Sequence, residues 1–223
     1  MKFDARAIQI LKNFSTINQS MIFKPGNEIR TISIGPNRNR SVIGRAKLNT
    51  EIDGTFAIYD LSNFLSAVTM FEEPELTITD KFMVIGSDQE NFHYTFCEPS
   101  LIMSAPEKEI QLPSVEVSFN LSSDTLNRVF RGMGVVSAPE IAFIGDGTNI
   151  YLQAIDSKDN TKSNYRIKVG ETDKTFRFVF LAENIKILSG EYEVSMCAKG
   201  ISHFKADDVE YWVAMEATST YNS

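Results

Sequence analysis

The sequence is poor in the residue types that carry most catalysis and metal binding. It has two histidines and two cysteines among 223 residues. His93 and His203 lie far apart in strand-like segments, and neither has Cys, Asp or Glu at the spacing of metal ligands. A Gly-x-Ser-x-Gly nucleophile motif is also missing. We therefore expect no catalytic residues, no metal site and no cofactor.

Two segments that resemble ligand-binding loops are each incomplete. Residues 145–148 look like a fragment of a phosphate-binding loop, but they lack its lysine and its following helix. Their Asp-Gly pair is typical of a hairpin turn. Residues 156–160 carry spaced acids, but they lack the glycine and the terminal glutamate of a calcium loop.

Long apolar runs are absent too. No run reaches the roughly 18 residues that a membrane helix needs, and Met1–Arg6 lacks the apolar core of a signal peptide. We expect Cys97 and Cys197 to be buried free thiols in a reducing compartment, with a disulfide as the alternative.

The basic excess of a typical nucleic-acid-binding protein is also missing, because the formal net charge is −7. Net charge is a sum, however, whereas binding depends on where the charges lie. The composition is 43% hydrophobic and 23% charged, which is ordinary for a soluble protein. The length suits one large domain or two small ones.

The most informative segment present is Ser122–Gly134, which predicts an amphipathic helix. Its apolar and polar residues recur with helical spacing on opposite sides. Ser122 or Ser123 can cap its start, and Gly132 and Gly134 suit its end. Taken alone, it is interpreted as a surface helix with solvated arginines. The apolar side consists of Leu126, Val129, Phe130 and Met133, and the polar side of Asp124, Asn127, Arg128 and Arg131.

The chain repeats one order of elements: helix, four strands, short helix, three strands. In the first half the predicted helices are Lys2–Asn18 and Leu61–Met70. In the second half they are Ser122–Met133, preceded by a strand at Val115–Leu121, and Ala182–Leu188. Matched residues lie at similar offsets, such as Lys12 with Arg131 (131 − 12 = 119), Asn63 with Asn184 (121) and Tyr94 with Trp212 (118).

Between the two halves, residues 103–113 carry two prolines and three charges without clear periodicity. We therefore predict an α+β protein with two similar domains, residues 1–102 and 115–223, joined by an extended connector of residues 103–114.

The predicted helices also carry most of the basic residues that could bind phosphate groups. If the two domains stand side by side, their polar faces form one basic strip that holds phosphates without reading bases. A second basic run either touches phosphate or forms a solvated hairpin. The strip consists of Lys2, Arg6, Lys12, Arg128, Arg131 and Lys186, and the second run of Arg38, Arg40, Arg45 and Lys47.

Four stretches of this sequence resemble the sliding clamps of T-even-type bacteriophages. They are I-L-K-N-F-S-T-I-N (10–18), A-I-Y-D-L-S-N-F-L (57–65), L-N-R-V-F-R-G (126–132) and the tail 178–220. The likeness runs from end to end and is weakest over Ile29–Asn49.

The resemblance implies a homotrimeric ring. Two helices per domain would line a central channel, with antiparallel sheets outside. The ring would encircle duplex DNA and tether the replicative polymerase, and it would itself be no enzyme. The basic strip would then face the channel, although the second helix adds no basic residue.

The resemblance also implies two contact surfaces. The subunit joint would pair Phe92–Cys97 with Lys162–Val169 of a neighbour, through Phe92, Tyr94, Phe96, Tyr165 and Ile167. A groove beneath the connector would take the polymerase C-terminal tail, and its residues would be Ile110, Leu112, Pro113, Trp212 and Val213.

Further implied partners are an ATP-dependent clamp loader and factors of late viral transcription, in the cytoplasm of the infected bacterial host. The alternative hypothesis is a non-enzymatic, β-rich structural phage protein whose basic helices merely face solvent.

Overall fold

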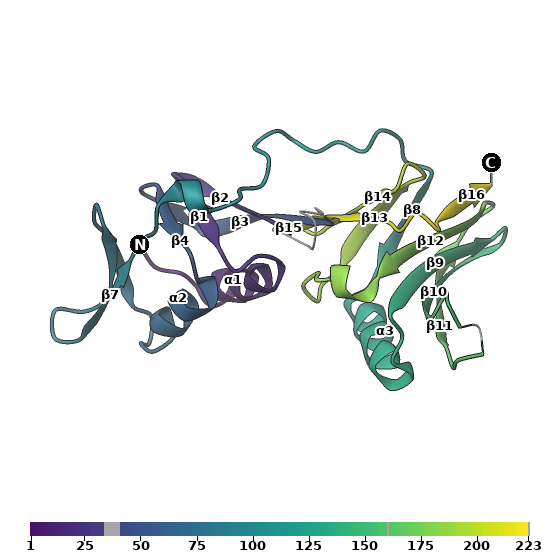
Figure 1. Cartoon of the computed structure of the whole chain (residues 1–223), viewed down its shortest axis with the longest axis horizontal. Helices are drawn as coiled ribbons and strands as arrows, with labels where there is room; N and C mark the ends of the chain where they lie inside the picture. The colour runs from purple at the N-terminus through teal and green to yellow at the C-terminus, as the bar shows by residue number, and fades with distance from the viewer. Residues whose placement is uncertain (34–40, 160, 223) are drawn as a thin grey trace. The chain divides into compact units, whose positions relative to one another are not determined.

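The computed structural model describes residues 1–33, 41–159 and 161–222 of the chain. The chain divides into two compact units, Met1–Glu107 and Lys108–Ser223, and each combines α-helical structure with antiparallel sheets (Figure 1). Arg38 and Arg40 of the second basic run lie outside the described residues.

Unit 1 follows the predicted order of helix, four strands, helix and three strands. Its ladders join β1 to β4, β2 to β3, and β5 through β6 to β7. The elements are α1 (Ala5–Ile17), β1 (Met21–Phe23), β2 (Gly26–Ile32), β3 (Val42–Ile52), β4 (Phe56–Ile58), α2 (Leu61–Val68), β5 (Glu75–Ile78), β6 (Phe82–Gly86), β7 (Asn91–Thr95) and the 3-10 turn η2 (Pro99–Leu101).

Helix α1 begins where Asp4 caps it. The carboxylate oxygen Oδ1 of Asp4 accepts a hydrogen bond from the backbone N–H of Ala7 at 2.7 Å, and Oδ2 accepts one from Asn49 at 2.9 Å. The bond from Ala7, followed by that from Asn49, lowers the pKa of the Asp4 carboxyl. The apolar side of α1 is fully buried at Ile10, Leu11 and Phe14.

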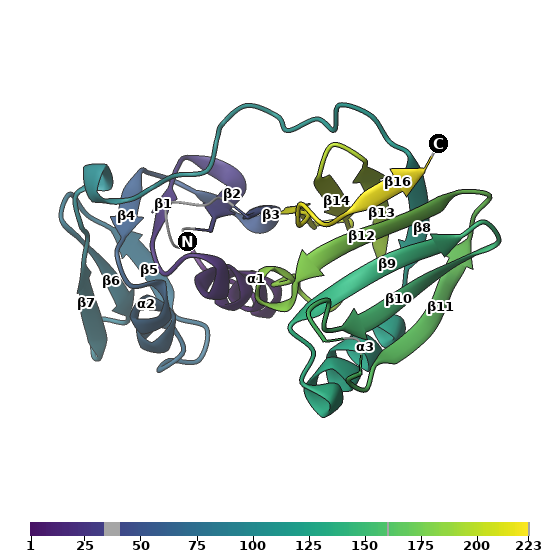
Figure 2. The ribbon, with the colours of Figure 1, turned by 45° about the vertical axis from the view of Figure 1, so that its right-hand side comes forward.

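Unit 2 repeats this order and adds a strand at each end. Its two sheets follow the strand orders β11-β10-β9-β12-β16 and β15-β14-β13-β8, and α3 packs against β10 and β11 (Figure 2). The elements are β8 (Val117–Leu121), α3 (Ser123–Val136), β9 (Glu140–Asp146), β10 (Asn149–Ile155), β11 (Tyr165–Glu171), β12 (Thr175–Leu181), the 3-10 turn η3 (Ala182–Asn184), β13 (Tyr192–Cys197), β14 (Ile201–Lys205), β15 (Val209–Ala214) and β16 (Thr220–Asn222).

The internal repeat extends to the way each unit begins. In unit 2, β8 pairs with β13. In unit 1, the backbone N–H₃⁺ and C=O of Met1 bond to the backbone O and N of Leu76 in β5, at 3.0 and 2.8 Å. The first residues of unit 1 therefore occupy the place of β8.

The predicted helix Ala182–Leu188 is wrong. Only the turn η3 forms, and Ile185 and Ile187 are both buried beyond it. Two β-branched residues that alternate with a half-exposed Lys186 follow an extended period of two, which disfavours a helix. Unit 2 therefore has one α-helix among its described residues.

Gly132 and Gly134 were predicted to end helix α3, and that prediction is wrong. The helix continues to Val136 and ends where Ser137 adopts a left-handed conformation with φ of 51°. A Cβ atom at Gly132 would lie 2.5 Å from Cγ of Tyr165, so the glycine permits close helix–strand packing. Ser122 caps the helix by accepting a hydrogen bond from Thr125 N–H at 3.2 Å.

Other predictions of local structure hold. Residues 145–148 form the β9–β10 hairpin, with Gly147 at φ of 87°. Both cysteines are free thiols, although only Cys197 is buried and Cys97 is half-buried. No helix among the described residues has the length and apolarity to cross a membrane.

Candidate DNA-facing helices and subunit edges

The polar side of α3 presents two arginines to solvent. The Arg128 side chain is 53% exposed and lies 3.8 Å from the Asp124 carboxylate one turn earlier. Arg131 is exposed, and its Nε donates to the Asn127 carbonyl at 3.4 Å. Because an exposed ion pair of this kind is weak, both guanidinium groups remain accessible to an anion such as phosphate.

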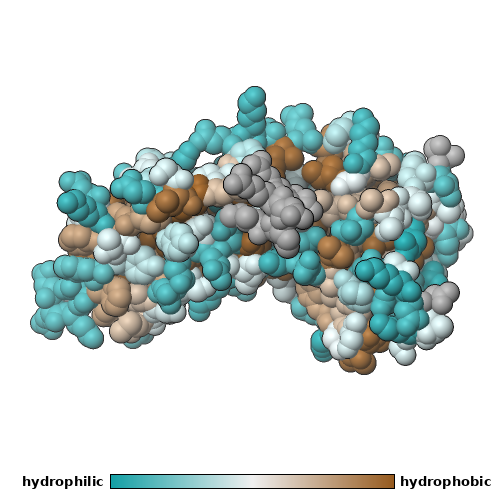
Figure 3. Space-filling model, viewed as in Figure 1, coloured by the Kyte–Doolittle hydropathy of each residue, from teal (hydrophilic) through white to brown (hydrophobic). Residues whose placement is uncertain are grey.

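The opposite side of α3 faces the sheet, as the sequence predicted. Leu126 and Val129 are buried, whereas Phe130 and Met133 are half-buried. Val135, near the end of the helix, is 85% exposed. Apolar side chains lie on the surface over the lower end of α3, next to hydrophilic ones (Figure 3).

Helix α1 carries the corresponding polar side in unit 1. Lys12 is exposed, and Arg6 donates from a terminal guanidinium nitrogen to Gln9 Oε1 at 2.8 Å. Lys12 and its predicted counterpart Arg131 thus both lie on exposed helix faces. Helix α2 exposes only uncharged polar side chains, Ser62, Asn63 and Ser66.

Two of the six basic candidates lie outside helices, which corrects the prediction. Lys2 precedes α1, and its backbone carbonyl accepts a hydrogen bond from Thr50 Oγ1 at 2.5 Å. Lys186 is half-buried beyond the turn η3. Lys2 lies outside α1 because the Asp4 side chain caps the helix and so marks its start. Of the second basic run, Arg45 and Lys47 lie on β3.

Four of the five predicted subunit-joint residues lie on edge strands, Phe92 and Tyr94 on β7 and Tyr165 and Ile167 on β11. Among the described residues, β7 pairs only with β6, and β11 pairs only with β10. Phe92 is 40% exposed, Tyr94 donates from its hydroxyl to the Asp60 carbonyl at 2.8 Å, and Tyr165 and Ile167 are half-buried. Such edges present unpaired backbone groups that can accept another strand.

The strand predicted at Phe92–Cys97 ends two residues earlier in the structure. β7 ends at Thr95, and the Cys97 N–H then donates to the Ala57 carbonyl at 3.0 Å, next to β4. Phe96 stacks on Phe56 with 5.2 Å between ring centroids. Phe96 is thereby placed beside β4, whereas Phe92 and Tyr94 belong to the β5-β6-β7 sheet.

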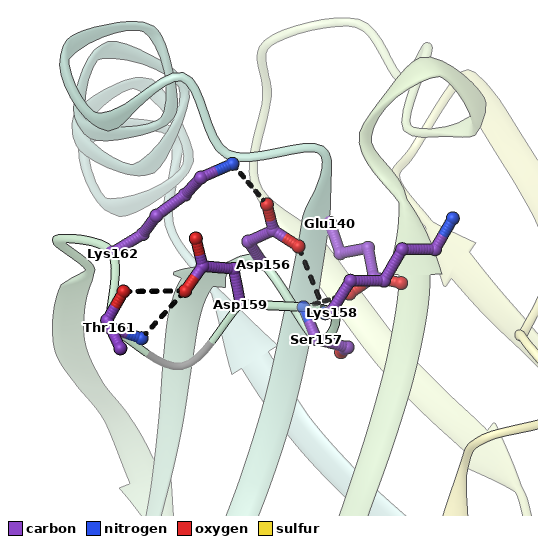
Figure 4. Close-up of polar contacts among 7 residues, drawn as sticks. All are labelled: Glu140, Asp156, Ser157, Lys158, Asp159, Thr161 and Lys162. Atoms are coloured by element: carbon purple, nitrogen blue, oxygen red, sulfur yellow. Dashed lines mark hydrogen bonds and ion pairs between the residues drawn. The ribbon is translucent and has the colours of Figure 1, made fainter.

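The loop that leads into β11 is held by its own carboxylates (Figure 4). Asp156 accepts from Lys162 Nζ at 2.6 Å and from Lys158 N–H at 3.0 Å, and these contacts lower the pKa of its carboxyl. Asp159 accepts from Thr161 N–H and Oγ1, and Glu140 from Ser157 N–H. Within the part of the chain that the structure describes, no cluster of three or more His, Cys, Asp or Glu side chains suits a metal ion.

The predicted groove residues differ in exposure. Ile110 and Leu112 are half-buried and Pro113 is exposed, whereas Trp212 is 4% exposed and Val213 is buried. The His203 ring stacks on Trp212, with centroids 4.5 Å apart and planes within 5°. Glu210 Oε2 lies 2.8 Å from Nε2 of the same imidazole.

No pattern in the sequence predicted the stacking of His203 on Trp212. The histidine lies on β14, where it is the Cα partner of Trp212 on β15. Only the strand register brings the two rings together, because nine positions separate them in the sequence. The signal available in the sequence was the alignment of the two strand-like segments that contain His203 and Trp212.

Comparison with solved structures identifies the class of fold. The chain superposes with a TM-score of 0.68 on a structure described as the C-terminal region of FEN-1 bound to A. fulgidus PCNA. The match covers 96% of each chain at 14% identity. The fold is that of a DNA sliding clamp.

Sequence comparison then gives the family. The family model described as "gp45 sliding clamp, C terminal" matches residues 118–217. The sliding clamp of Vibrio phage KVP40 is 32% identical over 97% of this chain and its own full length. The clamp of Escherichia phage RB69 is 28% identical over the full length of both chains. This chain therefore belongs to the sliding clamps of T4-like bacteriophages.

Proposed function

We propose that three copies of this chain form a ring that encircles duplex DNA and tethers the replicative DNA polymerase without catalysing a reaction itself. The observation that carries this proposal is the solvent-facing arginine pair of α3, Arg128 and Arg131, opposite a face that packs on β10 and β11. A clamp needs such cations without base readout, because phosphate contacts hold DNA independently of sequence.

The proposed channel contacts are Lys2, Arg6, Lys12, Arg128, Arg131 and Lys186. Four of them lie on helices, so three copies present twelve helical cations. Each phosphate contact releases counterions, and affinity therefore falls steeply with salt. A net charge of −7 per copy fits the same function, since negative charge elsewhere on the surface disfavours other contacts with DNA.

The proposed subunit joint pairs the end of unit 1 with β11 of a neighbouring copy. Phe92, Tyr94 and Phe96 would meet Tyr165 and Ile167, whose side chains are half-buried or partly exposed in the single chain. Burying these side chains while pairing open backbone edges is favourable on both counts.

The proposed groove for the polymerase tail comprises Ile110, Leu112, Pro113, Trp212 and Val213. The FEN-1 segment on A. fulgidus PCNA supports peptide capture by a clamp of this fold. Since the His203 ring stacks on Trp212, we expect the imidazole to move when a tail contacts that face of the indole ring. Apolar anchors in such pockets usually dominate binding energy.

The proposal extends to an ATP-dependent loader that opens the ring, and to mobile activation of late transcription in the infected host. These roles depend on the same ring. A β-rich structural protein with solvated basic helices is the competing function, and it requires neither a trimer nor DNA.

Primer extension on a long circular template tests the proposed function. With the loader and ATP present, the chain should lengthen the product of a single polymerase binding event. A solution mass of about three times 25.1 kDa should accompany this effect. A stable monomer at high concentration with unchanged product length favours the structural alternative.

A further inference from the structure

A cavity of about 330 Å³ lies within unit 1, between β1 and β2 and beside residues 103–107. In unit 2 the equivalent strands, β9 and β10, pair through six Cα partners. In unit 1, β1 pairs with β4 and β2 pairs with β3, and among the described residues no ladder joins β1 to β2. The cavity thus occupies the position where the repeated unit has a continuous sheet.

The sequence explains why these strands separate. Lys24-Pro25 joins β1 to β2, and Gly26 has a φ of 109°. Proline has no N–H for a ladder bond, and a register shift follows between Gly26 and Glu28. The β9–β10 hairpin turns instead through Gly147 without proline.

A hydrogen bond and an ion pair hold residues 103–107 beside the cavity. Arg30 donates to the Pro106 carbonyl at 2.6 Å, and Lys24 pairs with Glu107. This segment follows η2 and runs along β4 and β1 (Figure 2). Both the strands and the segment beside them therefore belong to one compact unit.

The lining is balanced in charge and mixed in polarity. Lys24 pairs with Glu107, and Arg30 Nε lies 2.5 Å from Glu28 Oε1, so each cation already has an anion. An ionised ligand would gain little from these groups. The remaining lining combines hydroxyl and apolar side chains, namely Ser20, Ser104, Thr31, Met21, Ile22 and Met103.

Thr31 adds an independent indication of a ligand. It lines the cavity at 3% exposure, and its hydroxyl oxygen has no hydrogen-bond partner in the described part of the chain. Buried polar groups in native proteins are nearly always paired, so an orphan hydroxyl beside a cavity calls for a partner. The volume is near the lower limit for ligand pockets, about 300 Å³, which suits one side chain better than a nucleotide.

We propose that this cavity binds one uncharged aromatic side chain with a hydrogen-bonding end, a tyrosine presented by an extended segment of a partner protein. The ring would pack on Met21, Ile22 and Met103, and its hydroxyl would pair with Thr31. Tyrosine combines an apolar body with a polar tip, which matches this lining. The lining shares no residue with the proposed groove at Ile110–Pro113 and Trp212, and the proposal does not depend on the clamp function.

The test uses the full-length protein labelled with ¹³C at its methionine methyl groups. The probe is N-acetyl-L-tyrosine amide, compared with the phenylalanine amide that lacks the hydroxyl. We expect saturable shifts at Met21 and Met103 but not at Met70 or Met133, with about five- to tenfold weaker binding of the phenylalanine probe.

Two variants sharpen this test. Thr31→Val should abolish the preference for tyrosine and also raise the melting temperature, because it removes an unpaired buried hydroxyl. Ala105→Trp should fill the cavity and block both probes, whereas Ser100→Trp, at an exposed position outside the lining, should block neither. Equal affinity for the two probes, or no saturable shift at Met21 and Met103, overturns the proposal.

Discussion

A Cβ atom at Gly132 would lie 2.5 Å from Cγ of Tyr165. Helix α3 and strand β11 are therefore packed as closely as a glycine allows. The helix carries the arginines proposed for DNA, and the strand carries the edge proposed for the subunit joint. A change at this contact is expected to disturb both surfaces together.

Gly132→Ala should destabilise unit 2 by about 1–3 kcal/mol, because the added methyl group overlaps the Tyr165 ring. Gly134 is the matched control, since a Cβ atom there has no neighbour within 4 Å. Gly134→Ala should stabilise the helix by about 0.5–1 kcal/mol. Urea unfolding of both variants measures the difference. Equal effects of the two substitutions would refute the packing role of Gly132.

Asp4→Ala should cost about 1 kcal/mol of stability at pH 7, because it removes the cap of α1. Hydrogen bonds lower the pKa of this carboxyl in the folded state. Its contribution is therefore present above the ordinary aspartate pKa of about 3.9 and is lost as pH falls through the lower folded value.

Thermal unfolding between pH 2 and pH 7 checks this prediction. Asp4→Asn is the control, because asparagine caps a helix about as well but does not titrate. Its stability should stay close to wild type at pH 7 and depend less on pH in the acid range. A wild-type profile for Asp4→Ala would contradict the capping role.

Reversing the charges of Arg128 and Arg131 to Glu should shorten the product of each polymerase binding event while leaving the trimer mass unchanged. Both side chains are exposed, so the fold does not depend on their charge. The control is Lys199→Glu with Lys205→Glu, which changes the net charge equally at other exposed positions of unit 2. Equal product lengths for the two double variants would exclude a specific role for the α3 face.

His203→Ala should move the fluorescence of Trp212 to longer wavelength, because the imidazole that covers the indole ring is removed. Trp212 is the single tryptophan of the chain, so the emission reports this position alone. His93→Ala is the control, since His93 stacks on Phe82 in unit 1. An unchanged spectrum in His203→Ala would show that the ring is shielded by other groups.

The sequence predicted what local periodicity determines. The buried and polar sides of α3, the order of helices and strands in both units and the turn at residues 145–148 follow from spacing and turn residues. The prediction failed at residues 182–188 because only the 3-10 turn η3 forms there, and residues 185–188 after it have no regular secondary structure. It also failed at Gly132, whose packing partner lies on a distant strand.

The candidate site was likewise predicted only in part from the sequence. Arg128, Arg131 and Lys12 were located from helical spacing, and the structure exposes all three. The joint and groove residues came from family resemblance and stay predictions, as do the domain limits 1–102, 103–114 and 115–223. The short strand β16 has no apolar pattern, and only its pairing with β12 defines it. The cavity beside residues 103–107 likewise depends on contacts distant in sequence.

The most direct measurement of the central claim is retention on DNA after loading onto a nicked circle. The protein should stay bound to the circle through a wash at high salt, because its attachment is topological. Linearising the same DNA should release it from the free ends. Equal loss from circular and linear DNA would contradict a ring that encircles and slides along the duplex.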